Sequence, residues 1–141
     1  TRPLVPTEFI SGAALLTSAA IWQAVGPLDE GYFMYFEDVD WCRRAERAGY
    51  RLASAADIVI IHHEGASYGG REFIRREHFW RALVRYLRRH DGLLAAGVVR
   101  LALALGTLVK LPLAALVDRS PQRAARLGLL RAQLRLGLWG R

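Results

Sequence analysis

The residues best suited to chemistry are an acidic group, Glu37, Asp38 and Asp40, and a histidine, His62, farther along the chain. Carboxylates and imidazoles are the side chains that most often transfer protons in catalysis. Adjacent residues of a regular helix point about 100° apart, so Glu37 and Asp38 cannot both face one ligand from a helix interior. At a helix N-terminus, a carboxylate can project into a cleft at the mouth of a sheet, where α/β proteins bind ligands. We therefore expect Asp38 to be the free carboxylate, with Glu37 and Asp40 orienting it.

Asp40 lies three and four residues before Arg43 and Arg44, the spacing at which opposite charges pair on a helix. The acidic group also has a purely structural interpretation. Carboxylates in a first turn stabilise a helix through its macrodipole by a few tenths to about 1 kcal/mol each. Trp41 and Cys42 are predicted to pack in the core, because a lone buried thiol is usually inert.

The acidic group needs a helix that begins with it, and the local signals predict one over 37–48. Carboxylates occupy its first turn, arginines follow, and Gly49 stands just past its end, which is how a helix marks both termini. The preceding stretch, 28–36, is rich in glycine and aromatic residues and is predicted to be a loop. A shorter helix is predicted over 19–25, with Thr17 or Ser18 as its N-cap.

Three short runs are predicted to be strands. The run 9–16 is expected to be a buried strand or strand-loop, with Gly12 where the backbone approaches another group closely. The runs 50–53 and 58–61 are of β type, and the second is apolar throughout, so we expect it to be buried. His62 follows this run directly, a position from which an imidazole can reach a metal or an anionic group.

The second half of the chain is predicted to be helical. Aromatic and aliphatic residues recur at helical spacing over 71–90, and 93–117 is very apolar. We predict no membrane-spanning helix there, because Arg100, Lys110 and Pro112 interrupt it. The end, 119–141, is predicted to be a basic amphipathic helix whose stripe is formed by Leu127, Leu130, Leu134 and Leu138.

Composition and charge narrow the classes of protein. Hydrophobic residues make up 52% of the 141 residues and charged residues 23%, which excludes an intrinsically disordered chain. A single cysteine excludes an internal disulfide framework and a multi-thiolate zinc site, and indicates a reducing compartment. Residues 1–70 carry five arginines against nine carboxylates, whereas 71–141 carry fourteen arginines and one lysine against four. A mildly acidic half is thus joined to a strongly basic one.

Six segments in a fixed order resemble the second half of family 2 glycosyltransferases, closest to the rhamnosyltransferase-like enzymes of cell-envelope polysaccharide synthesis. The match runs from about Val5 to Asp91. No single segment is specific, but their order is. The segments are Val5-Pro6, Phe9-Ile10-Ser11-Gly12-Ala13, Val25-Gly26-Pro27-Leu28-Asp29-Glu30, Phe33 to Arg44, Gly49-Tyr50 and His62-His63-Glu64-Gly65-Ala66-Ser67.

The resemblance implies an α/β protein that contains the C-terminal part of a GT-A fold. It implies inverting transfer of a sugar from a nucleotide-sugar to a glycan or polyprenyl-linked acceptor. Asp38 is then the general base, beside Glu37, and His62 helps to hold a divalent metal, Mg or Mn, that offsets the charge of the leaving diphosphate. Gly12 and Ala13 would line the donor and acceptor pocket, where Asp40 and Arg44 are further candidates for substrate contact.

The nucleotide-binding half of such enzymes, with its Asp-x-Asp metal motif, has no counterpart in this chain. We therefore expect a fragment, inactive alone, with the acceptor-side half of the domain over 1–91 and a helical tail over 92–141. The alternative function is a non-enzymatic membrane- or partner-binding helical module. A hydrolase with His62, His63 and Glu64 as metal ligands is a distant third, since consecutive residues at a strand end point in opposite directions.

The basic tail favours an anionic membrane surface as its partner. Leucine on one face, arginine on another and Trp139 near the end are typical of a helix that lies in a bilayer interface. Nucleic-acid binding is not expected, because interleaved aromatics and a recognisable reading module are missing from the sequence. These features predict a cytoplasmic protein that is peripheral at the inner face of the cell membrane.

Overall fold

The computed structural model describes residues 4–63 and 72–140 of the chain. The chain divides into two compact units, which we call the N-terminal unit, 1–64, and the helical unit, 65–141. The described residues are mostly helical, with one two-stranded sheet, and the predicted GT-A fold stays a prediction.

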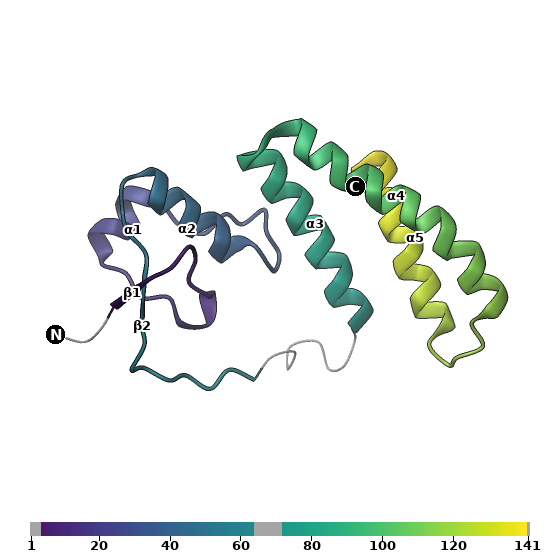
Figure 1. Cartoon of the computed structure of the whole chain (residues 1–141), viewed down its shortest axis with the longest axis horizontal. Helices are drawn as coiled ribbons and strands as arrows, with labels where there is room; N and C mark the ends of the chain where they lie inside the picture. The colour runs from purple at the N-terminus through teal and green to yellow at the C-terminus, as the bar shows by residue number, and fades with distance from the viewer. Residues whose placement is uncertain (1–3, 64–71, 141) are drawn as a thin grey trace. The chain divides into compact units, whose positions relative to one another are not determined.

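The sheet of the N-terminal unit pairs the beginning of the chain with a segment that follows its second helix. Strand β1 (Leu4–Pro6) runs antiparallel to β2 (Ala53–Ala55), with Val5 opposite Ser54 (Figure 1). The backbone N–H of Thr7 extends the pairing by donating to the Leu52 carbonyl at 3.2 Å.

Two helices of this unit confirm the predictions made from local signals. Helix α1 (Ala19–Val25) begins at Ser18, whose side chain accepts from the backbone N–H of Ile21 at 3.2 Å. It ends at Gly26, as the glycine-proline pair predicts. Helix α2 (Glu37–Arg47) begins with the acidic group in its first turn, and the predicted loop precedes it.

The core of the N-terminal unit forms where α2 packs against α1. Trp41 and Cys42 are buried, as predicted, together with Ala45 and Leu52. The Trp22 ring stacks on Trp41 with 5.5 Å between ring centroids, an arrangement worth about 0.5–1.5 kcal/mol beyond the buried area. The core therefore holds the residues that follow the acidic group in a fixed position.

The burial predicted for both apolar runs, 9–16 and 58–61, is wrong, and neither run forms a strand. Segment 9–16 instead contains a 3₁₀ turn, η1 (Gly12–Ala14), and Leu16 is 92% exposed. Segment 58–61 is not a strand, and its exposed fractions range from 52% to 87%. A buried strand needs neighbours for its backbone N–H and C=O groups. The two described strands pair with each other and leave these apolar runs without such neighbours.

The helical unit contains three helices, α3 (Glu72–His90), α4 (Gly92–Val117) and α5 (Arg123–Trp139). They pack on one another in all three pairings (Figure 1). Val84, Ala96 and Leu136, one from each helix, form its buried core. The helix predicted over 71–90 is confirmed from Glu72 onward.

The leucine stripe predicted on the last helix is only partly correct. Leu130 is buried, Leu127 and Leu134 are half-buried, and Leu138 is 54% exposed. The side chains that α5 buries are instead Leu129, Leu130 and Leu136, because this helix packs against α4.

Helix α4 differs from the expectation that its charges and proline exclude a membrane span. It continues through Pro112, and by length and composition alone it could cross a membrane. Core helices of soluble proteins and signal sequences share this property, so it does not by itself place α4 in a bilayer. The charge of Arg100 is used inside the unit, because its guanidinium donates to the carbonyls of Leu136 and Leu138 at 3.2 and 3.0 Å. Leu138 is in the last turn of α5, where carbonyls lack intrahelical partners, whereas the Leu136 carbonyl also accepts from the Gly140 N–H at 3.0 Å.

Candidate active site

The chain enters α2 in a strained conformation. Tyr35 and Phe36 have φ angles of 68° and 66°, in the left-handed region that costs an L-residue about 1–2 kcal/mol. Phe36 is the N-cap residue, although its side chain makes no capping hydrogen bond. Glu37 and Asp38 follow this turn directly and are the first two residues of the helix. Strain of this kind is concentrated at functional sites, and no sequence signal predicted it.

Asp38 joins the start of α2 to the η1 turn. Its Oδ2 accepts from the backbone N–H of Gly12 at 2.8 Å, and its Oδ1 accepts from Val39 N–H at 2.8 Å. The structure therefore brings together Gly12 and Asp38, two residues that the sequence had placed in one site. Ala13 lies in the same turn, where its N–H donates to the Ser11 hydroxyl at 3.3 Å.

Cys42 holds the same segment one helical turn farther along α2. Its Sγ accepts from the backbone N–H of Ile10 at 3.3 Å and donates to the Ile10 carbonyl at 3.7 Å. Burial raises the pKa of the Cys42 thiol, although the hydrogen bond from Ile10 opposes that effect. A fully buried thiol with a raised pKa is a structural group. Asp38 and Cys42 thus position Gly12 and Ile10 from one face of the helix.

Glu37 has a buried carboxylate oxygen. Its Oε2 is inaccessible to solvent and has no hydrogen-bond partner among the described residues. Burial raises the pKa of Glu37, its own backbone N–H opposes the rise, and the charge of Asp38 adds to it. An unsatisfied buried oxygen costs about 1–3 kcal/mol.

Asp40 and Arg44 form a buried ion pair, which confirms the pairing predicted from their spacing. Arg44 Nε donates to Asp40 Oδ2 at 2.9 Å, and the Tyr32 hydroxyl donates to Oδ1 at 3.4 Å. Asp40 has no exposed surface. The two terminal nitrogens of Arg44 donate to the carbonyls of Val25 and Pro27, both at 2.7 Å. The pair therefore connects α2 to the end of α1, and a direct contact of either residue with substrate stays a prediction.

Trp41 adds a second connection at this point. Its indole Nε1 donates to the carbonyl of Gly26 at 2.8 Å. Three consecutive carbonyls at the end of α1 are therefore bound by two side chains of α2. This explains why the residues after the acidic group are an aromatic and a charged side chain rather than aliphatic ones.

His62 is exposed and lies beyond β2 in the irregular segment that ends the described part of the N-terminal unit. Over residues 4–63 and 72–140, no three His, Cys, Asp or Glu side chains lie where they could hold a metal ion. Of the other residues of its motif, His63 is described and exposed, whereas Glu64, Gly65, Ala66 and Ser67 lie outside the described residues. The metal-binding role of His62 therefore stays a prediction.

Comparison with known proteins relates parts of the chain to glycosyltransferases. It is 38% identical over 64 residues to the N-acetylglucosaminyl-diphospho-decaprenol L-rhamnosyltransferase of Mycobacterium tuberculosis, a match that covers 45% of this chain and 21% of that protein. It is 33% identical over 84 residues to a rhamnosyltransferase of Escherichia coli, which covers 58% and 31%. A glycan-biosynthesis hexosyltransferase of Haloferax volcanii is 28% identical over 61 residues, which covers 43% and 20%.

The chain thus spans about a fifth to a third of the length of these relatives. No family model matches it, and no solved structure matches it. The names of the relatives support a glycosyltransferase role for the chain.

Proposed function

We propose that the N-terminal unit is the acceptor-activating part of an inverting family 2 glycosyltransferase. The observation that carries the proposal is the 2.8 Å hydrogen bond from Gly12 to Asp38. It joins two of the segments whose order resembles these enzymes, at the start of a helix whose orientation the buried core determines. The partial similarity to rhamnosyl- and hexosyltransferases supports the same reaction class.

In this proposal Asp38 accepts the proton of the acceptor hydroxyl. The hydroxyl oxygen forms a bond to the anomeric carbon of the donor sugar, and the bond from that carbon to the nucleotide diphosphate breaks. The electron pair leaves with the diphosphate. The hydrogen bonds from Gly12 and Val39 hold the Asp38 carboxylate in one orientation, which a general base requires.

Glu37 contributes the second carboxylate of the site. Its Oε2 is buried and lacks a donor among the described residues, so a hydroxyl of the acceptor would donate to it only after the Glu37 side chain turns toward the ligand. Asp40 and Arg44 act as positioning residues that fix α2 against α1. Gly12 and Ala13 leave room beside Asp38, since neither has a bulky side chain. A divalent metal held with the help of His62 belongs to the proposal, as do a cytoplasmic location and activity only within a longer protein.

The acceptor class comes from the chemistry in a relative's name. The Mycobacterium tuberculosis protein is named for transfer of rhamnose to an N-acetylglucosaminyl group that is linked through a diphosphate to decaprenol. We extend this class, a sugar linked to a polyprenyl diphosphate, to the present chain, with a nucleotide-sugar as donor.

The test is sugar transfer by the protein that carries this chain, with polyprenyl-diphosphate-linked acceptors and several nucleotide-sugars. Asp38→Asn keeps an acceptor oxygen for Gly12 but removes the base, so we expect a loss of about 10²–10⁴-fold. Glu46→Gln, an exposed substitution on the same helix, should leave the rate unchanged. Full activity of Asp38→Asn would overturn the role of Asp38, and a loss in Glu37→Gln alone would assign the base to Glu37.

A further inference from the structure

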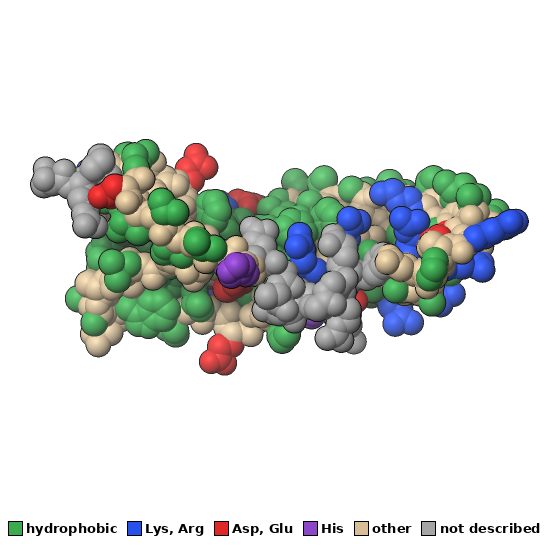
Figure 2. All heavy atoms as spheres, turned by 90° about the horizontal axis from the view of Figure 1, so that it is seen from below, with side chains coloured by type: hydrophobic (Ala, Val, Ile, Leu, Met, Phe, Trp, Pro, Cys, Tyr) green, Lys and Arg blue, Asp and Glu red, His purple; other side chains and the backbone are tan. Residues whose placement is uncertain are grey.

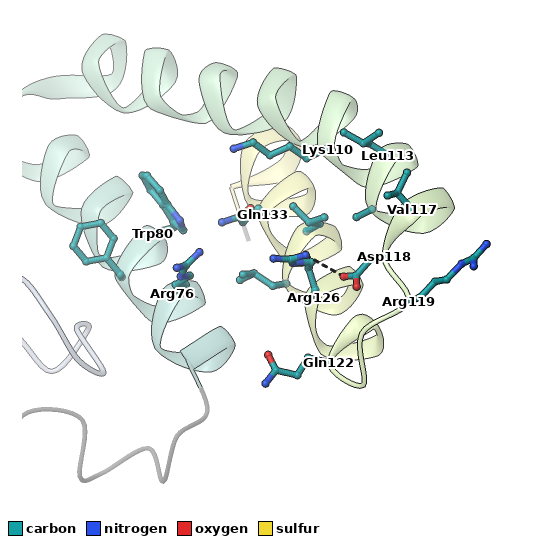
Figure 3. Close-up of a pocket in the computed structure, with 14 residues that line it drawn as sticks. Arg76, Trp80, Lys110, Leu113, Val117, Asp118, Arg119, Gln122, Arg126 and Gln133 are labelled. Atoms are coloured by element: carbon teal, nitrogen blue, oxygen red, sulfur yellow. Dashed lines mark hydrogen bonds and ion pairs between the residues drawn. The ribbon is translucent and has the colours of Figure 1, made fainter.

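A pocket of about 980 Å³ lies between the three helices of the helical unit (Figure 3). It is formed by this unit alone, and none of its lining residues belongs to α2. It is therefore separate from the candidate active site, and a ligand bound there would be independent of the proposed function.

Cationic side chains dominate the polar lining. Arg76 of α3, Lys110 of α4 and Arg126 of α5 point into the space between the helices (Figure 3). Asp118 is the one carboxylate among the lining residues the structure describes, and it is paired with Arg126 at 3.1 Å. Lys110 has no carboxylate partner within 4–63 and 72–140. The pocket thus carries a net positive charge, which favours an anionic ligand.

The remaining lining is apolar. Phe79 and Trp80 of α3 contribute aromatic rings, and Leu129 and Leu130 contribute aliphatic side chains from α5. A site for a free inorganic anion would need only the cations. The combination of cations with aromatic and aliphatic walls fits a molecule that is charged at one end and apolar at the other.

The apolar wall continues out of the pocket onto the exposed face of α4. Leu113 and Val117 line the pocket and are also 59% and 68% exposed. From them a band of exposed apolar side chains follows α4, which is about 39 Å long at 1.5 Å per residue. Figure 2 shows hydrophobic side chains along one edge of this unit, with arginine and lysine side chains beside them. The band consists of Leu93, Leu94, Val98, Leu101, Leu105, Leu108, Val109, Leu113, Leu116 and Val117.

An exposed apolar face of this length indicates an interaction site, because soluble monomers rarely leave such a face uncovered. The exposed apolar face of α4 lies beside the cationic pocket. An anionic phospholipid likewise has acyl chains beside a phosphate, so its acyl chains match the apolar face and its phosphate matches the pocket. Basic residues beside an apolar helix face are the pattern of helices that lie in the bilayer interface.

We propose that the helical unit binds an anionic phospholipid of a bilayer, with the lipid phosphate among Arg76, Lys110 and Arg126. The acyl chains lie along the exposed face of α4, which enters the interface. The sequence had assigned membrane attachment to the stripe on the last helix. The structure moves it to α4, because α5 uses its buried leucines to pack against that helix.

The test is co-sedimentation of the whole chain with phosphatidylcholine vesicles, with and without phosphatidylglycerol. Lys110→Gln combined with Arg126→Gln should weaken binding about 30-fold, at about fivefold for each cation removed near an anionic surface. The matched control is Arg131→Gln combined with Arg135→Gln, which removes the same charge from exposed positions outside the pocket. It should weaken binding less than about threefold, because exposed charges away from the site are screened by salt.

Asp118→Asn gives a change of the opposite sign. It removes the carboxylate from the pocket, so binding to phosphatidylglycerol vesicles should rise by up to about fivefold. A loosened fold would also expose apolar side chains that bind vesicles, so the circular dichroism of this variant should match that of the unchanged chain. If the double variant fails to fold by circular dichroism, Lys110→Gln alone decides, since Lys110 is exposed and makes no ion pair with the described residues.

Three outcomes would overturn the proposal. Equal losses in the pocket and control pairs would show attraction by net charge alone. Equal binding to vesicles of phosphatidylcholine alone would show that the pocket does not select an anionic lipid, because phosphatidylcholine carries a phosphate but no net charge. Inorganic phosphate that displaces the vesicles at equal phosphate concentration would identify the pocket as a site for the free anion.

Discussion

The backbone N–H of Gly12 donates to Oδ2 of Asp38 at 2.8 Å, across a separation of 26 residues. A Cβ placed on Gly12 would stand 3.5 Å from the Asp38 Cβ and 3.6 Å from its Oδ2, which are ordinary contact distances. Position 12 can therefore accept a methyl group without moving the backbone, although this methyl group would occupy space beside the carboxylate.

Gly12→Ala should consequently keep the fold and lower the activity. We expect the free energy of unfolding to change by less than about 1 kcal/mol, while sugar transfer falls because the acceptor loses room beside Asp38. Gly49→Ala is the converse control. Its φ of 89° makes a side chain there cost about 1 kcal/mol or more, with no effect on transfer once folded. Urea unfolding and transfer rates measure both. Normal transfer by the Gly12→Ala variant would remove Gly12 from the site.

Arg44 should be among the most important residues for the stability of the N-terminal unit. Arg44→Met removes three hydrogen bonds and leaves Asp40 buried without its cation. Breaking a buried ion pair in this way costs about 3–5 kcal/mol, so we expect a loss near the lower end, because Arg44 keeps 18% side-chain exposure. Arg51→Met, at an exposed position, is the control and should cost less than about 0.5 kcal/mol. Equal losses in the two variants would contradict the structural role of Arg44.

The pH dependence of the free energy of unfolding should show the raised pKa of Glu37. Burial raises its pKa in the folded state, so the folded protein binds this proton more tightly than the unfolded chain does. The stabilisation is fully present below the ordinary pKa of glutamate and is lost as pH rises through the raised value. Glu37→Gln should therefore be more stable than the natural protein at neutral pH, and the difference should shrink to that of a neutral pair in acid. Urea titrations across this pH range measure it. A difference that stays constant with pH would show that the Glu37 pKa is the same in both states.

The sequence predicted those parts of the fold that depend on local signals. Ser18 and the acidic first turn at Glu37 mark their helices within a few residues, because capping and dipole effects act over one turn. The pairing of β1 with β2 was missed, since it joins segments about fifty residues apart whose side chains carry no strong alternation. The prediction that the apolar run 58–61 is a buried strand was wrong for the same reason. A strand is stabilised by neighbouring strands, and the residues of the run do not show whether such neighbours exist.

Some features of the candidate sites could likewise be predicted from the sequence, and others could not. Asp38 and Gly12 were predicted as site residues from local signals and from the order of motifs, and the structure places them in contact. The left-handed φ angles of Tyr35 and Phe36 could not be predicted, because these residue types do not favour that conformation. The pocket of the helical unit was missed because three helices build it. A partial signal was present, since Arg126 and Gln133 lie seven residues apart on one face of α5. Such spacing identifies a face but does not show what lies opposite.

The contact between α4 and α5 depends on one glycine, and a second glycine of the same helix provides its control. A Cβ on Gly137 would lie 2.8 Å from the Arg100 carbonyl oxygen and 2.9 Å from the Ala104 Cβ. Gly128, nine residues earlier in α5, has nothing within 4 Å of such a Cβ. Gly137→Ala must therefore push the two helices apart, at a cost of about 1–3 kcal/mol for an overpacked contact. It would also displace the α5 carbonyls that Arg100 binds.

Gly128→Ala adds the same methyl group to the same helix in open space. It should stabilise the helical unit by up to about 1 kcal/mol, because alanine favours a helix more than glycine does. Thermal unfolding followed by circular dichroism gives both values, and the two substitutions should change the midpoint in opposite directions. Stabilisation by Gly137→Ala would mean that α4 and α5 do not approach each other closely. The set of apolar residues that α4 exposes would then be different, because α5 would no longer determine which face of α4 remains uncovered.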